Sequence, residues 1–243
     1  MVRQWLGAGV PLAGTGCAMA LPLLDMVAEA RAGVPFDATS LTEDYELGLA
    51  LAELGASAVL ARVPEAPGGP MVSVRAYFPD SIADAVRQKA RWMTGIALQG
   101  WDRTGWARSW NPLDHWMRLR DRRAPLAVLV LAAAYLAVLC WGVAALAHWW
   151  AGSAPPAISG IMRVLLGVNA VLLAWRFLVR SAWTWRSYGR REALLAVPRT
   201  VIGNFVSLLA ARRAMTQYLR SLAGAPQQWD KTRHSFPTAG EAA

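Results

Sequence analysis

The longest apolar run in the sequence extends from Pro125 to Trp150 and contains no formal charge. A helix of this length exceeds the roughly 20 residues that a bilayer crossing requires. The run opens with a proline, as the first turn of a helix often does, and tryptophans near its far end resemble the aromatic belt of a membrane interface. We therefore expect a transmembrane helix over residues 125–150.

A second apolar run covers Ala157 to Trp175 and is interrupted only by Arg163, which lies close enough to its start to reach the interface. Together the runs predict a two-helix transmembrane hairpin over residues 121–191. Arginines lie on both outer flanks, whereas the connecting loop carries no charge, so the positive-inside rule places residues 1–120 in the cytoplasm. The flanking arginines are Arg118, Arg120, Arg122 and Arg123 before the hairpin, and Arg176, Arg180, Arg186, Arg190 and Arg191 at its end.

A third apolar stretch, Ala193 to Ala211, is interrupted by Pro198 and Arg199. The uninterrupted part from Thr200 onward is too short to cross a bilayer. A third crossing would also carry the following arginines to the outside, against the positive-inside rule. Residues 192–243 are therefore expected to form an amphipathic helix in the cytoplasmic interface, followed by a cytoplasmic tail. A third crossing is the alternative.

Composition and charge agree with a membrane protein. Hydrophobic residues make up 55% of the 243 residues and charged residues 17%, which excludes a disordered chain. The net charge of +9 is uneven, because residues 1–80 hold four arginines against nine acidic residues and the basic excess follows later. Those arginines bracket apolar runs, an arrangement that favours a membrane over nucleic acid as the partner.

A helix is predicted to begin near Ser40, where Ser40 and Glu43 fit a capping box. Leucines at positions 47, 51 and 54 form a stripe that a helix would bury, and Gly55 is a suitable C-terminal glycine. Glu43 and Asp44 then lie in the first turn, where the positive end of the helix stabilises carboxylates. Such a carboxylate is a candidate general base. From this segment alone, complementing the helix dipole is the favoured explanation.

Two strands are predicted at Ala58–Val63 and Met71–Phe78, followed by a helix that begins after residues 79–81 and runs to about Gly100. On this helix Gln88 and Arg91 share a face, and a guanidinium beside an amide suits a diphosphate. The neighbouring indole of Trp92 suits a sugar ring. Four further tryptophans are expected to pack at the membrane interface: Trp101, Trp106, Trp110 and Trp116.

These motifs together resemble a specific family. Thr42-Glu43-Asp44, followed by Gln88-Lys89-Ala90-Arg91-Trp92 and then transmembrane helices, resembles the acceptor half of a membrane-bound glycosyltransferase family 2 enzyme with TED and QxxRW motifs. Gly14-Thr15-Gly16 stands where that family has a glycine-rich acceptor loop. The tail Trp229-Asp230-Lys231-Thr232 is similar to the bacteriophage adsorption protein B branch, at the bacterial inner membrane.

The resemblance implies that residues 1–120 form the acceptor-side half of a GT-A domain, a Rossmann-like α/β fold, ahead of the helical membrane region. It further implies inverting transfer from a nucleotide-sugar donor to a growing exopolysaccharide-type glycan. Asp44, assisted by Glu43, would deprotonate the acceptor. Gln88 and Arg91 would contact the nucleotide diphosphate, and Trp92 the acceptor sugar. The remaining substrate-binding residues would be Thr42, Gly14, Thr15 and Gly16.

The same resemblance implies a divalent metal, Mg or Mn, held by a DxD motif that this sequence does not contain before Thr42. We expect the chain to be a fragment, or a subunit that needs a donor-binding N-terminal half. The alternative is a catalytically inactive fragment or accessory membrane scaffold of a polysaccharide secretion system. The histidines are too scattered for a metal site: His115, His148 and His234.

Overall fold

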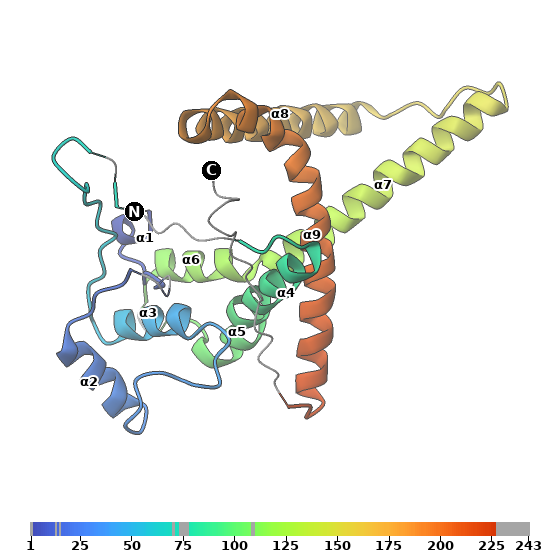
Figure 1. The fold of residues 1–243 in the computed structure, drawn as a ribbon. Coiled ribbons are helices and arrows are strands. Elements are labelled where there is room, and N and C mark those ends of the chain that lie inside the picture. Colours follow the sequence, from blue (N-terminus) through green and yellow to red (C-terminus); the bar gives the residue numbers. More distant parts are fainter. Residues whose placement is uncertain are drawn as a thin grey trace. The chain divides into compact units, whose positions relative to one another are not determined.

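The computed structural model describes residues 2–12, 14, 16–69, 71–72, 78–107 and 110–226 (Figure 1). The chain divides into two compact units. One comprises the residues up to Ala127 together with those from Leu209 onward, and the other comprises Val128–Leu208. Thr15 and the tail from Trp229 lie outside the described residues, so the predictions made for them stay predictions.

The first unit is built from short helices. They are α1 (Val2–Trp5), α2 (Leu21–Ala30), α3 (Glu43–Glu53), α4 (Ile82–Met93), α5 (Gln99–Thr104) and α6 (Pro112–Arg122). Local chemistry sets several of their ends. The Ser81 hydroxyl accepts a hydrogen bond from the Asp84 amide at 3.1 Å and caps α4, as predicted. Gly55, with φ of +84°, follows the end of α3, where the left-handed backbone favours glycine.

Helix α4 continues through a π-helical turn, η1 (Thr94–Leu98), into α5. The wider turn brings Gly100 directly against the carbonyl oxygen of Gly95, so close that no side chain fits there. The helix predicted to end near Gly100 therefore reaches Thr104, with the π-turn inside it. Single π-helical turns within helices are often found at functional sites.

The small core of this unit lies between α2 and α3. The predicted leucine stripe is confirmed here, because Leu47 and Leu51 are buried against Val27. Burying each of these side chains contributes about 2 kcal/mol. Partly buried apolar residues complete the cluster: Leu12, Met19, Leu23, Leu24, Leu54 and Ala56.

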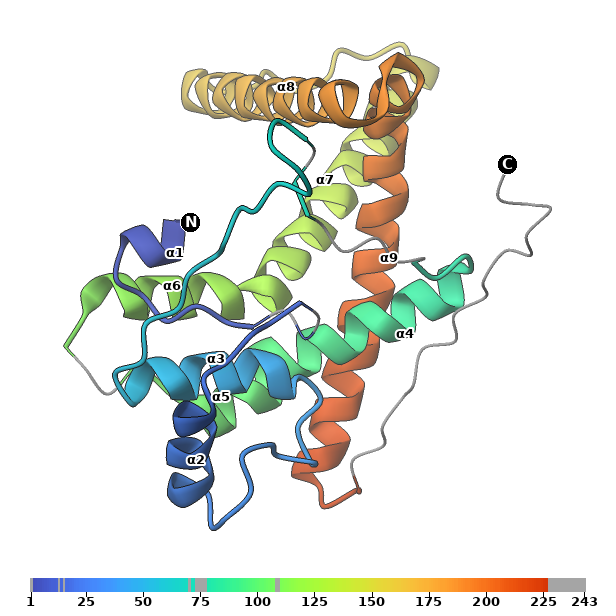
Figure 2. The ribbon, with the colours of Figure 1, turned by 60° about the vertical axis from the view of Figure 1, so that its left-hand side comes forward.

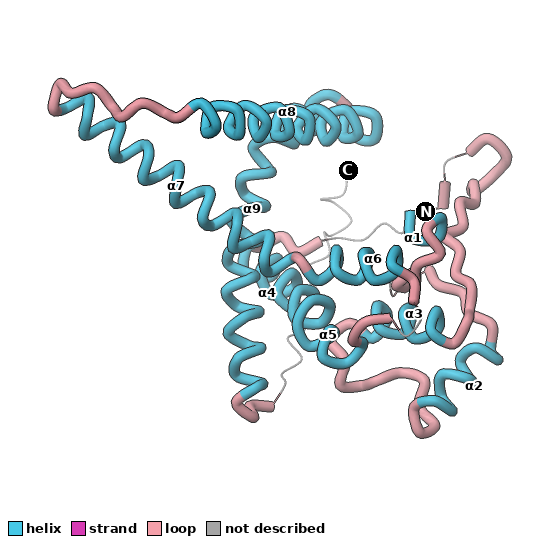
Figure 3. The backbone as a smooth tube through the Cα atoms, turned by 180° about the vertical axis from the view of Figure 1, so that it is seen from behind, coloured by secondary structure: helices cyan, strands magenta, loops and turns pink. Residues whose placement is uncertain are grey.

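The predicted α/β character is not found in the described residues, which contain helices and loops but no named strand (Figure 3). The strand predicted at Ala58–Val63 is wrong: the segment is a loop up to an isolated antiparallel bridge between Pro64 and Met71. A strand requires a ladder of backbone hydrogen bonds, and among the described residues no strand lies beside 58–63 to supply one. Most of the second predicted strand, residues 73–77, lies outside the described part.

The predicted capping box is also wrong. Helix α3 begins at Glu43, with Thr42 as its N-cap residue and no side-chain cap. The Ser40 hydroxyl instead donates to the carboxylate of Glu46 at 2.7 Å. The serine is drawn away because Glu46 is buried and needs hydrogen-bond donors.

Three long helices follow: α7 (Ala124–Trp150), α8 (Gly160–Tyr188) and α9 (Arg190–Leu222). Each is long and apolar enough to cross a membrane. Helix α7 agrees closely with the predicted span 125–150, whereas α8 begins three residues later than predicted and extends to Tyr188. Large apolar side chains along both helices are exposed, as contact with lipid requires.

Helix α9 corrects one part of the prediction. It runs without a break through Pro198, so the proline does not shorten the apolar stretch. Length alone therefore does not exclude a crossing by α9.

Candidate functional site

The Thr42-Glu43-Asp44 motif forms the start of α3. Thr42 is buried, whereas Glu43 and Asp44 are half-buried in the first turn, where they face the positive end of the helix. One Asp44 carboxylate oxygen accepts a hydrogen bond from the Tyr45 amide at 2.8 Å. The carboxylate is thus held by a backbone donor and is partly open to solvent.

Gly14, the first residue of the predicted glycine-rich loop, lies at this carboxylate. A Cβ atom placed on Gly14 would lie 2.9 Å from the second Asp44 oxygen, so the two residues are in direct contact. One turn further along α3, the backbone of residues 10–12 crosses Gly48, where a Cβ would lie 2.5 Å from the Val10 carbonyl oxygen. Asp44 and Gly48 share a face of α3. Residues 10–12 and Gly14 therefore lie along the same helix face.

Thr42 links the same helix start to the second motif. Its side chain packs against Gly95 in the π-helical turn, where a Cβ on the glycine would lie 2.6 Å from the threonine hydroxyl. Gly95 follows Arg91 by one helical turn. The hydroxyl is buried and has no hydrogen-bond partner in the described part of the chain. The Thr-Glu-Asp turn is therefore fixed directly onto the helix that carries the second motif.

Gln88, Arg91 and Trp92 lie on α4 as predicted, with the glutamine and the arginine half-buried and the tryptophan 41% exposed. Ala90, between them, is fully buried and anchors the helix. Among the described residues, no hydrogen bond joins Asp44 to Gln88 or Trp92. The structure thus joins the motifs through Thr42 and Gly95.

A buried ion pair that the sequence did not predict also holds α3. The Glu46 carboxylate, 3% exposed, accepts hydrogen bonds from the Arg103 guanidinium at 3.0 and 3.1 Å and from Ser40. Arg103 lies on α5, beyond the π-turn. The pair therefore joins α3 to α5, which continues α4 beyond the π-turn. Nothing in the local pattern marks Arg103, because its partner is 57 residues away.

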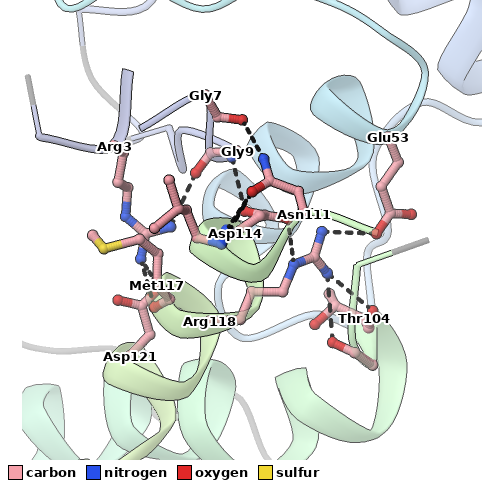
Figure 4. Close-up of polar contacts among 12 residues, drawn as sticks. Arg3, Gly7, Gly9, Glu53, Thr104, Asn111, Asp114, Met117, Arg118 and Asp121 are labelled. Atoms are coloured by element: carbon pink, nitrogen blue, oxygen red, sulfur yellow. Dashed lines mark hydrogen bonds and ion pairs between the residues drawn. The ribbon is translucent and has the colours of Figure 1, made fainter. Parts of the chain in front are cut away.

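Arg118 of α6, one of the arginines predicted to flank the membrane region on its cytoplasmic side, is the centre of a second network (Figure 4). Arg118 and Arg122 are buried, and the cytoplasmic side of this flank stays a prediction. Arg118 donates to Glu53 at 2.8 Å and to Asp114 at 3.2 Å, and Asp114 in turn accepts from the Gly9 amide at 2.9 Å. Burial of this charge is tolerated because two carboxylates and backbone oxygens surround it.

The tryptophans divide into two groups. Trp101 and Trp106 meet edge to face, and the Arg122 guanidinium lies over the Trp101 ring at 4.6 Å, an attractive cation–π arrangement. Trp110 and Trp116 are largely exposed. Their role at the membrane interface stays a prediction.

Two clefts of about 710 and 910 Å³ occur in this unit. The first is lined by Glu46, Arg103 and residues of α2, and the second by α4, α5 and the end of α9. Asp44, Gln88 and Arg91 line neither. No group of three or more His, Cys, Asp or Glu in the described residues is arranged to hold a metal ion.

Comparison with known proteins gives consistent matches. The model of the family described as glycosyl transferase family group 2 matches residues 1–210. Bacteriophage adsorption protein B of Escherichia coli (strain K12) is 32% identical over 98% of this chain, as is bacteriophage N4 adsorption protein B of Escherichia coli O157:H7. The chain spans 34% of the length of both relatives. No solved structure matches it.

Proposed function

Because the chain belongs to glycosyl transferase family group 2, we propose that it forms the acceptor side of an inverting enzyme that transfers a sugar from a nucleotide-activated donor to a glycan at a membrane. The observation that carries the proposal is the junction of three sequence features at one helix start. Gly14 contacts the Asp44 carboxylate, and the adjacent Thr42 packs on the helix that carries Gln88 and Arg91.

In this proposal Asp44 acts as the general base. It removes the proton of an acceptor hydroxyl while that oxygen attacks the anomeric carbon of the donor, and the bond from that carbon to the nucleotide diphosphate breaks. The proton ends on Asp44 and the electron pair on the departing diphosphate. Glu43, in the same turn, adds negative potential near the proton, and Gly14 leaves the carboxylate accessible by having no side chain.

The second motif supplies binding. Gln88 and Arg91 contact the diphosphate, whose growing charge a guanidinium stabilises with paired hydrogen bonds. The exposed indole of Trp92 stacks on the acceptor sugar. Thr42, Thr15 and Gly16 complete the acceptor side. The divalent metal implied by the family resemblance would be held by the donor-binding half, since the described residues contain no ligand cluster for it.

The donor-binding half belongs, in this proposal, to another part of the enzyme, on the same polypeptide or on a partner chain. The length of the relatives supports this, because the chain spans only 34% of them. The acceptor is a growing glycan of the exopolysaccharide type.

The proposal places the site on the cytoplasmic face of a bacterial inner membrane. Between Ala127 and Leu209 the chain leaves its first compact unit and returns to it. Within this first unit, Tyr218 of α9 donates to Asp102 at 2.9 Å, and Gln99 donates to Ser221 of α9 at 3.2 Å. Two segments of one folded unit share a side of the bilayer, so the number of crossings between them is even. This supports crossings by α7 and α8, with α9 in the interface.

The test is sugar transfer by membranes that contain the native protein. Membranes are incubated with Mg²⁺ and, one at a time, with radiolabelled nucleotide sugars, and the label in the glycan and the released nucleoside diphosphate are measured. The proposal expects one donor class to give equal amounts of both products, and none from membranes that lack the protein. If no donor gives more label than those control membranes, the proposal is wrong and a scaffold role replaces it.

A further inference from the structure

The 910 Å³ cleft is lined on α4 by residues outside the QxxRW motif. Its lining includes Val86 and Arg87 of α4 and, two turns after them, the buried Thr94 of the π-turn η1. Successive helical residues are separated by about 100°, which places Gln88 and Trp92 on the other face and Arg91 between the two faces. None of these three residues lines the cleft. The cleft is therefore separate from the proposed diphosphate site. Figure 2 shows α4 beside the C-terminal half of α9, which forms the other wall.

One face of α9 supplies most of the polar lining. The residues that line the cleft recur at intervals of three and four, the spacing of a single helical face. They are Leu209, Arg212, Arg213, Thr216, Gln217 and Arg220. The neighbouring face is packed, because Ala210 and Ala214 are fully buried. This wall is thus held by packing while its arginines stay accessible.

The lining is strongly positive. It contains the three arginines of α9 and Arg87 of α4, and none of the described residues that line it is acidic. Arg87 is paired with Asp84, so Arg212 and Arg220 of α9 are the main source of positive potential in the cleft. Like charges on one helix face repel one another, and a bound anion removes that repulsion. Arginine forks match phosphate oxygens in particular.

Two buried polar atoms point to the rest of the ligand. Thr94, 1% exposed, has a hydroxyl with no hydrogen-bond partner in the described part of the chain, and the same holds for the side-chain carbonyl of Gln99. The Gln99 amide NH₂ already donates to Ser221, whose own hydroxyl donates to the Tyr218 carbonyl at 2.8 Å. Because the Ser221 hydroxyl gives its proton to Tyr218, it can only accept from Gln99. The NH₂ group of Gln99 therefore faces Ser221, and its side-chain oxygen remains an acceptor. The site therefore offers donors for an anion and one acceptor for a hydroxyl.

We propose that this cleft, the arginine cleft, binds a phosphate ester that carries a free hydroxyl. Arg212, Arg220 and the Thr94 hydroxyl hold the phosphate oxygens, and the Gln99 carbonyl accepts the hydrogen bond of the hydroxyl. The same chemistry is offered by the headgroup of a phosphatidylglycerol-type lipid and by a free phosphorylated polyol. The experiment distinguishes these two sources.

The test uses the full chain purified in an uncharged detergent. Lipid retention is measured by native mass spectrometry with phosphatidylglycerol and with phosphatidylcholine, and binding of glycerol phosphate is measured by calorimetry. The double variant Arg212→Gln/Arg220→Gln is expected to weaken binding about tenfold or more. The matched control, Arg180→Gln/Arg186→Gln on α8, removes the same charge outside the cleft and is expected to change binding less than about threefold.

Binding of phosphatidylglycerol alone supports the proposal with a lipid as the source, and binding of glycerol phosphate supports it with a soluble ester. Gln99→Leu is further expected to weaken binding of glycerol phosphate but not of methyl phosphate, which lacks the hydroxyl. Binding of neither probe, or equal losses in the cleft and control variants, overturns the proposal. None of these readouts depends on sugar transfer.

Discussion

The contact between Gly14 and Asp44 shows how a loop and a helix start jointly shape one carboxylate. Asp44 is fixed by the backbone amide of Tyr45, and the left-handed Gly14, with φ of +76°, lies against its second oxygen. A side chain at position 14 would be strained by this φ and would collide with the carboxylate. Both the identity and the order of these residues therefore matter for access to Asp44.

Gly48 is a residue whose replacement tests this arrangement. Gly48→Ala would place a Cβ against the Val10 carbonyl and the Leu12 amide, which are backbone atoms of the segment that leads to Gly14. Overpacking of this kind costs about 1–3 kcal/mol, so we expect the thermal midpoint of the purified chain to fall by several degrees.

The control for Gly48 is Gly203→Ala on α9, where nothing lies within 4 Å of the added Cβ. This change should leave the midpoint unchanged or raise it slightly, because alanine favours a helix over glycine. Equal midpoints for both variants would show that the segment does not lie on Gly48.

At the scale of elements, buried ion pairs join helices that are distant in sequence. Arg118 of α6 is fully buried between Glu53 of α3 and Asp114 of its own helix. Glu46 and Arg103 form the corresponding link between α3 and α5. Because the apolar core of this unit is small, these ion pairs help to hold α3, and with it Asp44, in place.

Arg118→Ala is predicted to destabilise the first unit strongly. The change leaves two carboxylates without their guanidinium, and loss of one partner of a buried pair costs about 3–5 kcal/mol. The loss is measured by thermal or chemical unfolding of the purified chain. Arg120→Ala, an exposed arginine on the same helix, is the matched control and should change stability by less than about 0.5 kcal/mol. Similar losses in both variants would contradict a structural role for Arg118.

The sequence predicted those elements whose determinants are local. The leucine stripe of α3, the Ser81 cap of α4 and the α7 span follow from spacing, capping and length, and the structure has all three. It did not predict features that depend on distant partners. The 58–63 strand needs a neighbour to pair with, and Ser40 is diverted from capping by the buried Glu46. The burial of Arg118 depends on Glu53, which lies 65 residues away in the sequence.

The same distinction holds for the site. The TED and QxxRW motifs and the acceptor-loop role of Gly14 follow from the resemblance to the family. The contacts of Gly14 with Asp44 and of Thr42 with Gly95 depend on the fold and required the structure.

At the scale of the whole molecule, the two ends of the membrane region return to one unit, so the proposed topology has an even number of crossings. The chain has two cysteines, Cys17 and Cys140, and Cys17 is exposed. In Cys140→Ala, Cys17 should react with a membrane-impermeant maleimide only after spheroplasts are opened.

Two further thiols complete this topology test, each in a background without Cys17 and Cys140. Leu222→Cys, at the end of α9, should behave as Cys17 does. Ser153→Cys, between α7 and α8, should react in intact spheroplasts. If the Leu222→Cys thiol is labelled in intact spheroplasts while Cys17, in its own variant, is not, the number of crossings between them is odd. That result would contradict the proposed topology.

The central claim is that Asp44 is the base of a sugar transfer, and the most direct measurement compares Asp44→Asn with Asp25→Asn in the membrane transfer assay. Asparagine keeps the size of the side chain but cannot accept the proton, so we predict a loss of at least about 100-fold in transfer rate with normal membrane insertion. Asp25→Asn, at an exposed position on α2, removes an equal charge and should leave the rate unchanged. Wild-type turnover by Asp44→Asn would contradict the assignment of Asp44 as the base.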